Sequence, residues 1–235
     1  VARRNGLRIV EDACHAIGTT FAAGGEQHRV GDNSFADMSC FSFHPVKTIA
    51  VGEGGAVTTN DDTLAAIVAR DRNHGMTRQP ADFVHPAEAF DGNAEANPWY
   101  YEMEAPGLNY RIPDVLCALG ISQLKKLDRF ARRRRELVAQ YDRELTSLGP
   151  HVKPLSRTPD VTPAWHLYVA LIDFAALGVD RAAVMRRLSA KNIGTQVHYL
   201  PVYRQPYYRE FDPRLSLPGA DEYYRRTLSL PLFPA

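Results

Sequence analysis

A short, largely apolar run that ends in acidic residues is the feature that most constrains the fold of this chain. Leu7–Val10 is preceded by a glycine and followed at once by Glu11 and Asp12. Such a run is typical of a buried strand in a parallel sheet. A second strand is predicted at Asp37–Phe43, and the spacing of 35 residues from Asp12 to Lys47 is enough for a strand, a crossover and a strand. The sequence therefore predicts an α/β fold with a mainly parallel sheet.

The first half of the chain continues with a third strand and a capped helix. The strand is predicted at Ala56–Thr59, and Asn60–Asp62 supplies the cap of a helix that runs to about Asn73. Residues 76–106 are polar, carry several prolines and aromatic residues, and lack clear periodicity. A loop of this length is usually functional or disordered.

One long helix is predicted to join two domains. It opens at Arg111–Asp114, where a proline suits the first turn, and apolar residues recur at helical spacing up to Gly149. Beyond it the pattern predicts a strand, a helix, a strand and a helix, which is typical of a small α+β domain. These four elements are expected at Trp165–Asp173, Arg181–Lys191, Thr195–Tyr199 and Tyr223–Leu228. We therefore expect one domain at residues 1–125 and a second at 126–235.

Composition and charge argue against several classes of protein. The formal net charge is +1 and charged residues make up 23% of the chain, so no overall field favours nucleic acid or a membrane surface. The three cysteines are widely spaced and odd in number, which argues against a disulfide framework and fits a reducing compartment. No window has the length of a transmembrane helix and no signal peptide opens the chain. We expect a cytoplasmic protein. Because the sequence starts without methionine, in what resembles the end of a helix, we also expect a fragment of a longer one.

Lys47 is the lysine with the most unusual surroundings. The chain has 5 lysines against 23 arginines, and Lys47 alone lies beside a glycine cluster, Gly52–Gly55. A surface lysine in a loop is the ordinary interpretation. The alternative is a lysine that forms a Schiff base with an aldehyde. The local sequence leaves both interpretations open.

Asp12 also has two interpretations. An acid at the end of a strand often caps the next helix. At the carboxyl end of a parallel strand, however, it faces the crevice in which open α/β sheets bind ligands, and its charge there would keep a pyridine nitrogen protonated. Together with Lys47, the hydroxyl of Ser42 and the glycine cluster, it supplies the parts needed to hold pyridoxal phosphate.

Other reactive residues give weaker signals. Ser42 is either a strand hydroxyl satisfied by its neighbours or a phosphate ligand. The Gly52–Gly55 run lacks the Lys-Ser/Thr of a nucleotide-binding loop. His15 and His44 are more often structural than ligands, and without paired His or Cys spacing we expect no metal site. No elbow motif supports a serine hydrolase.

Several motifs together resemble the DegT/DnrJ/EryC1/StrS family, which consists of pyridoxal-phosphate-dependent sugar aminotransferases with the aspartate-aminotransferase fold (fold type I). They occur in the family's order over nearly the whole chain, at Val10–Gly18, Phe41–Lys47, Gly52–Asn60, Gly107–Asp114, Ala118–Leu124, Gly194–Tyr199 and Ser229–Phe233. The resemblance implies that residues 1–125 are the C-terminal part of the large cofactor-binding domain and that 126–235 form the small α+β domain. The family's N-terminal portion, which completes its phosphate site, is absent.

The resemblance also assigns cofactor contacts to single residues. Lys47 would bind pyridoxal 5′-phosphate covalently and shuttle protons. Asp12 would pair with the pyridinium nitrogen, and His15 would contact the cofactor ring or its 3-hydroxyl. Ser42 would bind the phosphate.

Further roles concern a partner subunit and the substrate. The family builds its sites across a homodimer, so either Asn109 or Arg111 would reach the phosphate of the neighbouring subunit. Which of the two does so stays open. Contact with the sugar substrate is implied for His44, His198 and Tyr199.

Two segments point to one branch within the family. Pro98–Met103 and Thr195–Tyr203 are most similar to the branch that makes pseudaminic acid. That branch implies transfer of an amino group from L-glutamate to C4 of a UDP-linked 4-keto-6-deoxy-N-acetyl sugar. UDP-4-keto-arabinose and GDP-4-keto-6-deoxymannose are alternative substrates, and an inert fragment that binds a partner or a sugar nucleotide is a further alternative. A dehydratase offshoot replaces the lysine with histidine, and Lys47 argues against it.

Overall fold

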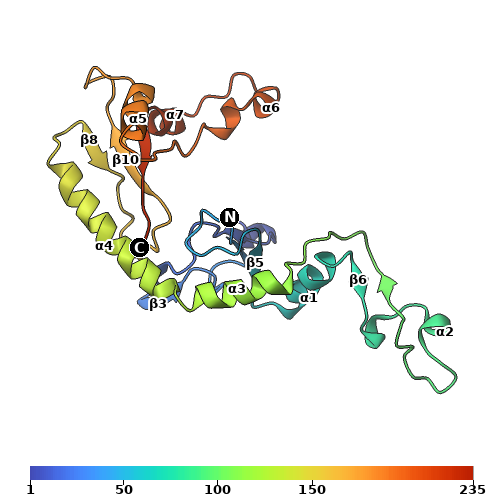
Figure 1. The fold of residues 1–235 in the computed structure, drawn as a ribbon. Coiled ribbons are helices and arrows are strands. Elements are labelled where there is room, and N and C mark those ends of the chain that lie inside the picture. The colour runs from blue at the N-terminus through green and yellow to red at the C-terminus, as the bar shows by residue number, and fades with distance from the viewer. Residues whose placement is uncertain (235) are drawn as a thin grey trace. The chain divides into compact units, whose positions relative to one another are not determined.

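The computed structural model describes Val1–Pro234 and divides into two compact units (Figure 1). The first unit comprises Val1–Cys14 and His28–Leu124, and the second comprises His15–Gln27 and the chain from Lys125 onward. The short segment after β1 thus groups with the C-terminal residues. Within the described residues, no helix is both long and apolar enough to cross a membrane.

The first unit is built on a three-stranded sheet in the order β1-β4-β5. β1 (Val10–Asp12) and β4 (Met38–Ser42) are parallel, and β5 (Gly55–Thr58) is antiparallel to β4. The sequence pattern predicts a mainly parallel sheet, whereas within this chain one pairing is parallel and the other is not. The reason is the connection between β4 and β5, which closes on itself through a hydrogen bond from the Phe43 N–H to the Gly54 carbonyl (2.9 Å).

Short elements precede and follow this sheet. A 3-10 turn, η1 (Arg3–Asn5), opens the chain. Helix α1 (Asp62–Asp71) follows β5, and the Asp61 carboxylate caps it by accepting hydrogen bonds from two backbone N–H groups of the first turn. The predicted cap and helix are therefore confirmed, because a carboxylate satisfies N–H groups that have no partner inside the helix.

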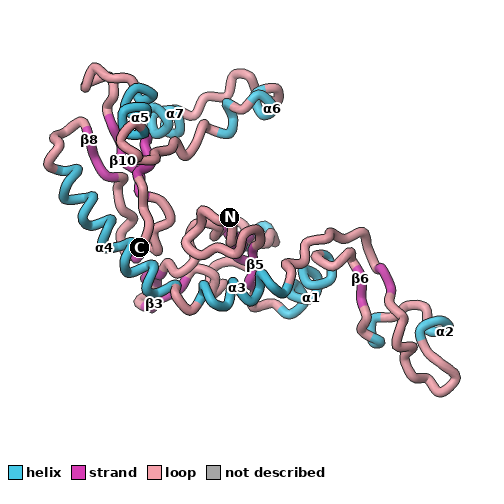
Figure 2. The backbone as a smooth tube through the Cα atoms, in the orientation of Figure 1, coloured by secondary structure: helices cyan, strands magenta, loops and turns pink. Residues whose placement is uncertain are grey.

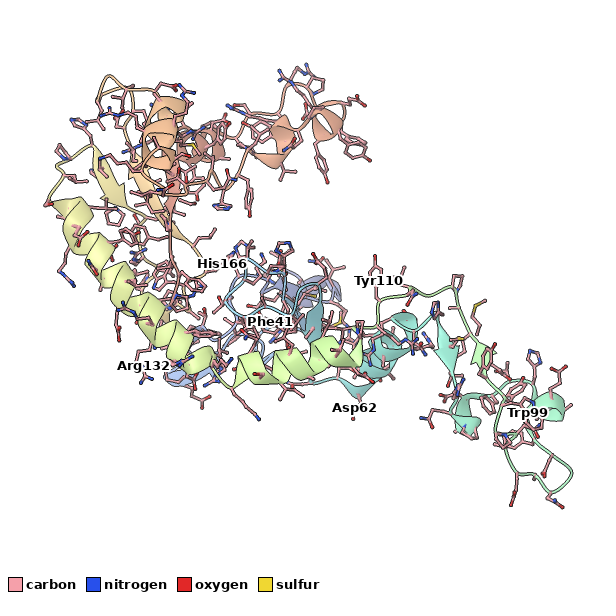
Figure 3. All side chains as sticks on the ribbon, viewed as in Figure 1. Phe41, Asp62, Trp99, Tyr110, Arg132 and His166 are labelled. Carbon is pink, nitrogen blue, oxygen red and sulfur yellow. The ribbon has the colours of Figure 1, made fainter. Side chains whose placement is uncertain are left out.

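The segment expected to be a long loop, residues 76–106, forms several short elements. These are β6 (Met76–Thr77), η2 (Pro80–Asp82), α2 (Pro86–Ala89) and β7 (Glu102–Met103), with β6 and β7 antiparallel. A buried carboxylate organises them: Glu102 accepts hydrogen bonds from the N–H groups of Val84 (2.8 Å) and His85 (2.9 Å) and from the Tyr100 hydroxyl (2.9 Å). Trp99 and Tyr110, by contrast, are largely exposed (Figure 3).

The predicted long helix is two helices. α3 (Asp114–Leu124) belongs to the first unit and α4 (Leu127–Thr146) to the second. Five residues of α4 are buried, whereas no residue of α3 is, and Val115 and Leu119, which are four residues apart on α3, are exposed although apolar. An apolar helix face that stays open is typical of an association surface.

The core of the second unit lies between α4 and an antiparallel sheet in the order β11-β10-β8. Val138 and Leu145 of α4 pack with Tyr168 and Ala170 of the central strand, and the rings of Tyr141 and Tyr168 stack at 4.6 Å. The three strands are β8 (Val152–Pro154), β10 (Tyr168–Ile172) and β11 (Thr227–Leu230).

Further helices and a small sheet complete the second unit (Figure 2). The helices are α5 (Arg181–Ser189), η3 (Val202–Arg204), α6 (Pro206–Arg209) and α7 (Pro218–Arg226). The small sheet has the order β3-β2-β9, with β2 (Thr20–Ala23), β3 (Glu26–Arg29) and β9 (Val161–Thr162). Gly24 and Gly25 both have positive φ and form the two-residue turn between β2 and β3, as tight hairpins require.

Two predictions near the C-terminus differ from the structure. The strand expected at Thr195–Tyr199 is wrong, because only Gln196 forms a bridge, to Ser229. The helix expected at Tyr223–Leu228 is confirmed up to Arg226, where α7 ends, but Thr227 begins β11. The strand forms there because Thr227–Leu230 pairs with β10, where Thr227 and Leu228 are almost fully buried.

Candidate active site

Asp12 ends β1 at the carboxyl edge of the parallel pair. Its Cα is level with that of Cys40 in β4, and the N–H of Ala13 donates to the Cys40 carbonyl (2.9 Å). The Asp12 carboxylate accepts a hydrogen bond from the backbone N–H of Cys14 (3.1 Å). The carboxylate is therefore held at the strand end, the edge at which open α/β sheets bind ligands.

Lys47 lies on the loop that leaves β4. Its N–H donates to the His44 carbonyl (2.9 Å), and the Val51 N–H returns to the Phe43 carbonyl (2.9 Å), so the loop is closed by its own main chain. Lys47 is half-buried, between the exposed Val46 and the buried Thr48. A lysine that is rigidly placed and partly withdrawn from water differs from the usual mobile surface lysine.

Asp12 and Lys47 both influence the pKa of the Cys14 thiol. A hydrogen bond with the Asp12 carboxylate and burial raise the pKa of the Cys14 thiol, while the positive charge of Lys47 works in the opposite direction. Both charged groups are therefore within electrostatic range of one side chain of the first unit. Asp12 and Lys47 follow adjacent strands of one sheet, β1 and β4, and their joint action in one site stays a prediction.

Ser42 and His44 lie between these two groups in the chain. Ser42 is the last residue of β4, is level with Gly55 of β5, and its hydroxyl accepts a long hydrogen bond from the His44 N–H (3.4 Å). A Cβ on Gly55 would lie 2.5 Å from the Phe41 carbonyl oxygen, so only glycine allows the two strands to approach here. His44 is exposed, with its Nε2 3.7 Å from the Glu53 carboxylate.

Asn109 and Arg111 are exposed and lie on the segment that returns from β7. Asn109 forms a bridge with Asn73, just beyond α1, and the neighbouring Tyr110 N–H donates to the Arg72 carbonyl (2.9 Å). The two residues therefore sit beside the end of α1 rather than on β1 or β4. Their exposure leaves them accessible to another molecule.

His15, His198 and Tyr199 belong to the second unit. The His15 ring packs edge-to-face on that of His166, with centroids 4.4 Å apart. His198 is hydrogen bonded through Nδ1 to the Ser229 hydroxyl (2.7 Å), and its ring contacts that of the exposed Tyr199. That these three residues join Asp12 and Lys47 in one site stays a prediction.

Three residues that contact or directly follow a candidate residue were not themselves candidates in the sequence analysis. Cys14 was noted only as an unpaired cysteine, although it contacts Asp12. Thr48 is buried next to Lys47, and its hydroxyl has no hydrogen-bond partner among the described residues. His166 lies within the strand predicted at Trp165–Asp173, where nothing distinguishes it from its neighbours, and β10 begins only at Tyr168. Of the three, only Thr48 could have been singled out from the sequence, because its hydroxyl directly follows Lys47.

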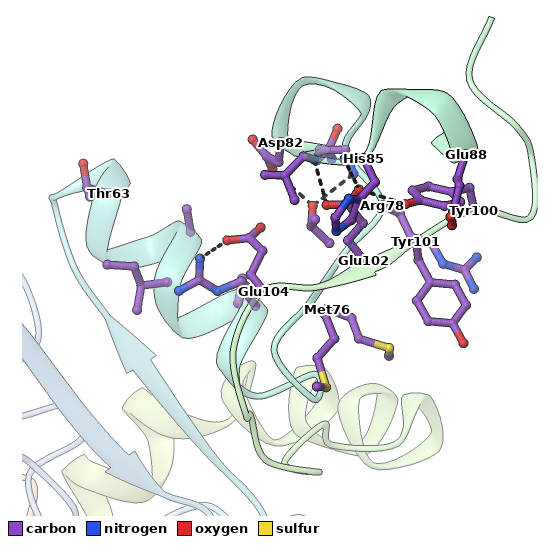
Figure 4. A pocket seen from close by; sticks show the side chains of 18 residues that line it. Thr63, Met76, Arg78, Asp82, His85, Glu88, Tyr100, Tyr101, Glu102 and Glu104 are labelled. Atoms are coloured by element: carbon purple, nitrogen blue, oxygen red, sulfur yellow. Dashed lines mark hydrogen bonds and ion pairs between the residues drawn. The ribbon is translucent and has the colours of Figure 1, made fainter. Parts of the chain in front are cut away.

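The first unit also has a groove that is lined by residues other than Asp12 and Lys47. A groove of about 1170 Å³ lies between α1 and the short elements of residues 76–104, lined by polar side chains such as Arg70, Glu88 and Tyr100 (Figure 4). No candidate residue lines it. Among residues 1–234, no group of three or more His, Cys, Asp or Glu side chains is placed to hold a metal ion.

Comparison with known proteins gives consistent matches over the whole chain. The model of the DegT/DnrJ/EryC1/StrS aminotransferase family matches residues 1–235. The spore coat polysaccharide biosynthesis protein SpsC of Bacillus subtilis is 38% identical over 100% of this chain and 57% of its own length. The chain therefore spans little more than half the length of the curated relatives it matches.

Solved structures agree with the sequence matches. PseC of Helicobacter pylori, an aminotransferase involved in the biosynthesis of pseudoaminic acid, superposes with a TM-score of 0.82 at 29% identity, over 99% of this chain and 56% of its own. The PLP form of Spr1654 from Streptococcus pneumoniae gives a TM-score of 0.77 at 26% identity, over 97% of this chain and 53% of its own. The expected fold, that of the type I pyridoxal-phosphate-dependent transferases, is thereby confirmed.

Proposed function

The chain belongs to the DegT/DnrJ/EryC1/StrS aminotransferase family, and on that premise we propose that it supplies Lys47 and Asp12 to the active site of a sugar aminotransferase that uses pyridoxal 5′-phosphate. The observation that supports this proposal is the position of the two residues in the sheet: Asp12 ends β1, and Lys47 lies on the loop that leaves β4, the strand parallel to β1.

The residues of the first unit fit this cofactor. Lys47 offers the amine that binds an aldehyde, Asp12 the carboxylate that pairs with a pyridine nitrogen, and Ser42 a hydroxyl for the phosphate. Next to Lys47, the buried hydroxyl of Thr48 has no partner among the described residues. A buried polar atom of this kind is costly unless something else satisfies it.

The proposed roles concern protons at named atoms. Bound pyridoxal phosphate would supply an electron-withdrawing ring that makes the carbon beside a bound amine acidic. Lys47 Nζ would take the proton from Cα of glutamate and later deliver a proton to C4 of the sugar. General acid–base help of this kind contributes about 10²- to 10⁴-fold. Asp12 would hold the proton on the ring nitrogen.

The substrate pair that we propose is L-glutamate and a UDP-linked 4-keto-6-deoxy-N-acetyl sugar. The likeness to PseC, an aminotransferase involved in the biosynthesis of pseudoaminic acid, and to SpsC, a spore coat polysaccharide biosynthesis protein, supports a nucleotide-sugar substrate. Such a reaction would belong in the cytoplasm, where nucleotide sugars are made.

We further propose that the protein acts as a homodimer with shared sites. The exposure of Asn109 and Arg111 and the open apolar face of α3 support this proposal, because exposed apolar surface is typical of an association surface. His15, His44, His198 and Tyr199 complete the proposed site. Sedimentation of the full-length protein as a monomer at micromolar concentration would contradict the shared site.

A half-reaction assay tests the function. Full-length protein loaded with pyridoxal 5′-phosphate is mixed with L-glutamate, and 2-oxoglutarate is measured, followed by a panel of UDP- and GDP-linked 4-keto sugars. We expect 2-oxoglutarate from the wild type and none from Lys47→Ala, with an aminated product only from the matching sugar. A protein that stays colourless with added cofactor and forms no 2-oxoglutarate would instead be the inert alternative. Normal turnover by Lys47→Ala would remove Lys47 from its role.

A further inference from the structure

Two histidines of the second unit form a close ring pair. The rings of His15 and His166 meet edge-to-face, with centroids 4.4 Å apart and planes inclined by 62°. His166 lies between β9 and β10 and is 7% exposed. An edge-to-face contact of this kind fixes the orientation of both rings, because the positive edge of one faces the negative face of the other.

A buried arginine holds the main chain around His166. Arg134 of α4 is 5% exposed, and its Nη1 donates to the carbonyls of Trp165 (3.2 Å), His166 (3.1 Å) and Leu232 (3.0 Å). Burial lowers the pKa of the Arg134 guanidinium. Hydrogen bonds from a charged donor are stronger than neutral ones, so these contacts fix the peptide groups on both sides of the His166 side chain.

The segment that carries His15 is anchored to the same place. The Thr19 hydroxyl accepts a hydrogen bond from the Ala164 N–H (3.0 Å) in buried surroundings. Gly18 has positive φ, and a Cβ there would lie 3.3 Å from both Ala164 and Leu127. The turn after β1 is therefore packed against the residues that precede His166, so the two rings meet between anchored segments.

We infer that His166 is a positioning residue for His15: it holds the His15 ring in the orientation that the cofactor ring requires. The inference rests on the proposed function, in which His15 contacts the ring of pyridoxal phosphate or its 3-hydroxyl. His15 is exposed on the turn three residues beyond Asp12, and its ring packs against that of the buried His166. Arg134 in turn fixes the peptide groups on both sides of His166.

A double-mutant cycle on cofactor affinity tests this inference. The dissociation constant of pyridoxal 5′-phosphate is measured for full-length wild type, His166→Leu, His15→Ala and the double variant. The position of the visible absorption band of the bound cofactor is recorded for each. His166→Leu keeps the volume and the carbonyl that Arg134 binds but loses the aromatic edge. We expect it to raise the dissociation constant about three- to ten-fold and to shift the band, and to have no further effect once His15 is alanine.

Two controls separate positioning from stability. His166→Phe keeps a ring at this position and should restore most of the affinity. Tyr168→Phe removes a buried hydroxyl from the neighbouring strand, where it bonds Asp142 (2.8 Å), without touching either histidine. It should lower the melting temperature while leaving cofactor affinity unchanged.

The possible results distinguish a failure of the positioning role from a failure of the proposed function. An unchanged dissociation constant in His166→Leu, or the same loss with and without His15, overturns the positioning role. A loss of affinity in Tyr168→Phe as large as that in His166→Leu does so too, because it would mark a stability effect. Failure of the wild type to bind pyridoxal phosphate at all would refute the proposed function instead, so the two failures are distinguishable.

Discussion

The backbone at Gly107 packs directly against the backbone at Gly75, so the substitution Gly107→Ala tests this contact. Gly75 follows α1 and Gly107 precedes α3, and a Cβ on Gly107 would lie 2.0 Å from the Gly75 nitrogen and 2.4 Å from the His74 carbonyl carbon. Real Cβ contacts essentially never fall below 3.0 Å. Gly107→Ala must therefore move one segment by about 1 Å, and both contacted atoms are backbone, which yields less easily than a side chain.

The free energy that this movement costs can be worked out from the backbone hydrogen bonds that it would weaken. His74 N–H donates to the Leu108 carbonyl (2.9 Å) and Leu108 N–H to the Asp71 carbonyl (2.7 Å), immediately beside the contact. Overpacking costs about 1–3 kcal/mol and each weakened hydrogen bond about 1 kcal/mol. We expect Gly107→Ala to lower the free energy of unfolding by about 3 kcal/mol.

Urea titration of the full-length protein measures this difference. Gly92→Ala is the matched control, because a Cβ on Gly92 would meet nothing within 4 Å, and its effect should stay within about 0.5 kcal/mol. Equal stability of the two variants would refute the close crossing of the segments. The contact between Gly75 and Gly107 matters for the proposed function because Asn109 and Arg111, proposed to reach the neighbouring subunit, follow Gly107 directly in the chain.

Three other perturbations have defined outcomes. Asp61→Ala removes the cap of α1 and should cost about 1 kcal/mol in urea titrations, and an unchanged midpoint would speak against the cap. A hydrogen bond from the Ser34 backbone N–H holds the pKa of Asp32 at about 2, below its ordinary value of 3.8. The stability that the ionised Asp32 contributes is therefore complete above about pH 4 and is lost as the pH falls through about 2. Asp32→Asn should flatten the unfolding free energy over that window, and a curve that keeps the wild-type slope contradicts this. Tyr168→Phe leaves Asp142 without one hydrogen bond and should cost about 1 kcal/mol in thermal unfolding, and a wild-type melting temperature would show that the bond contributes nothing.

The sequence was sufficient to predict those helices and strands that are determined by residues close together in the chain. Asp61 starts α1 because its carboxylate reaches N–H groups two and three residues ahead. The strand β4 lies within the predicted strand Asp37–Phe43. Asp12 and Lys47 became candidates because each follows a predicted strand.

Elements decided by distant contacts were not predictable in this way. The break between α3 and α4 occurs at Lys125–Lys126, where neither glycine nor proline stands and apolar residues continue on both sides. Thr227–Leu230 becomes a strand only because it pairs with β10. The contact of His15 with His166 joins segments far apart in the chain. No periodicity in the sequence encodes such pairs, because tertiary packing overrides local propensity.

The residue that binds the cofactor covalently is the most direct test of the proposed chemistry. Full-length protein is loaded with pyridoxal 5′-phosphate, reduced with borohydride, digested, and mapped by mass spectrometry. We expect the added mass of the reduced cofactor on the peptide that contains Lys47, and no modified peptide from Lys47→Arg. The added mass on any other lysine, or its absence from wild-type protein that binds the cofactor, would contradict the assignment of Lys47.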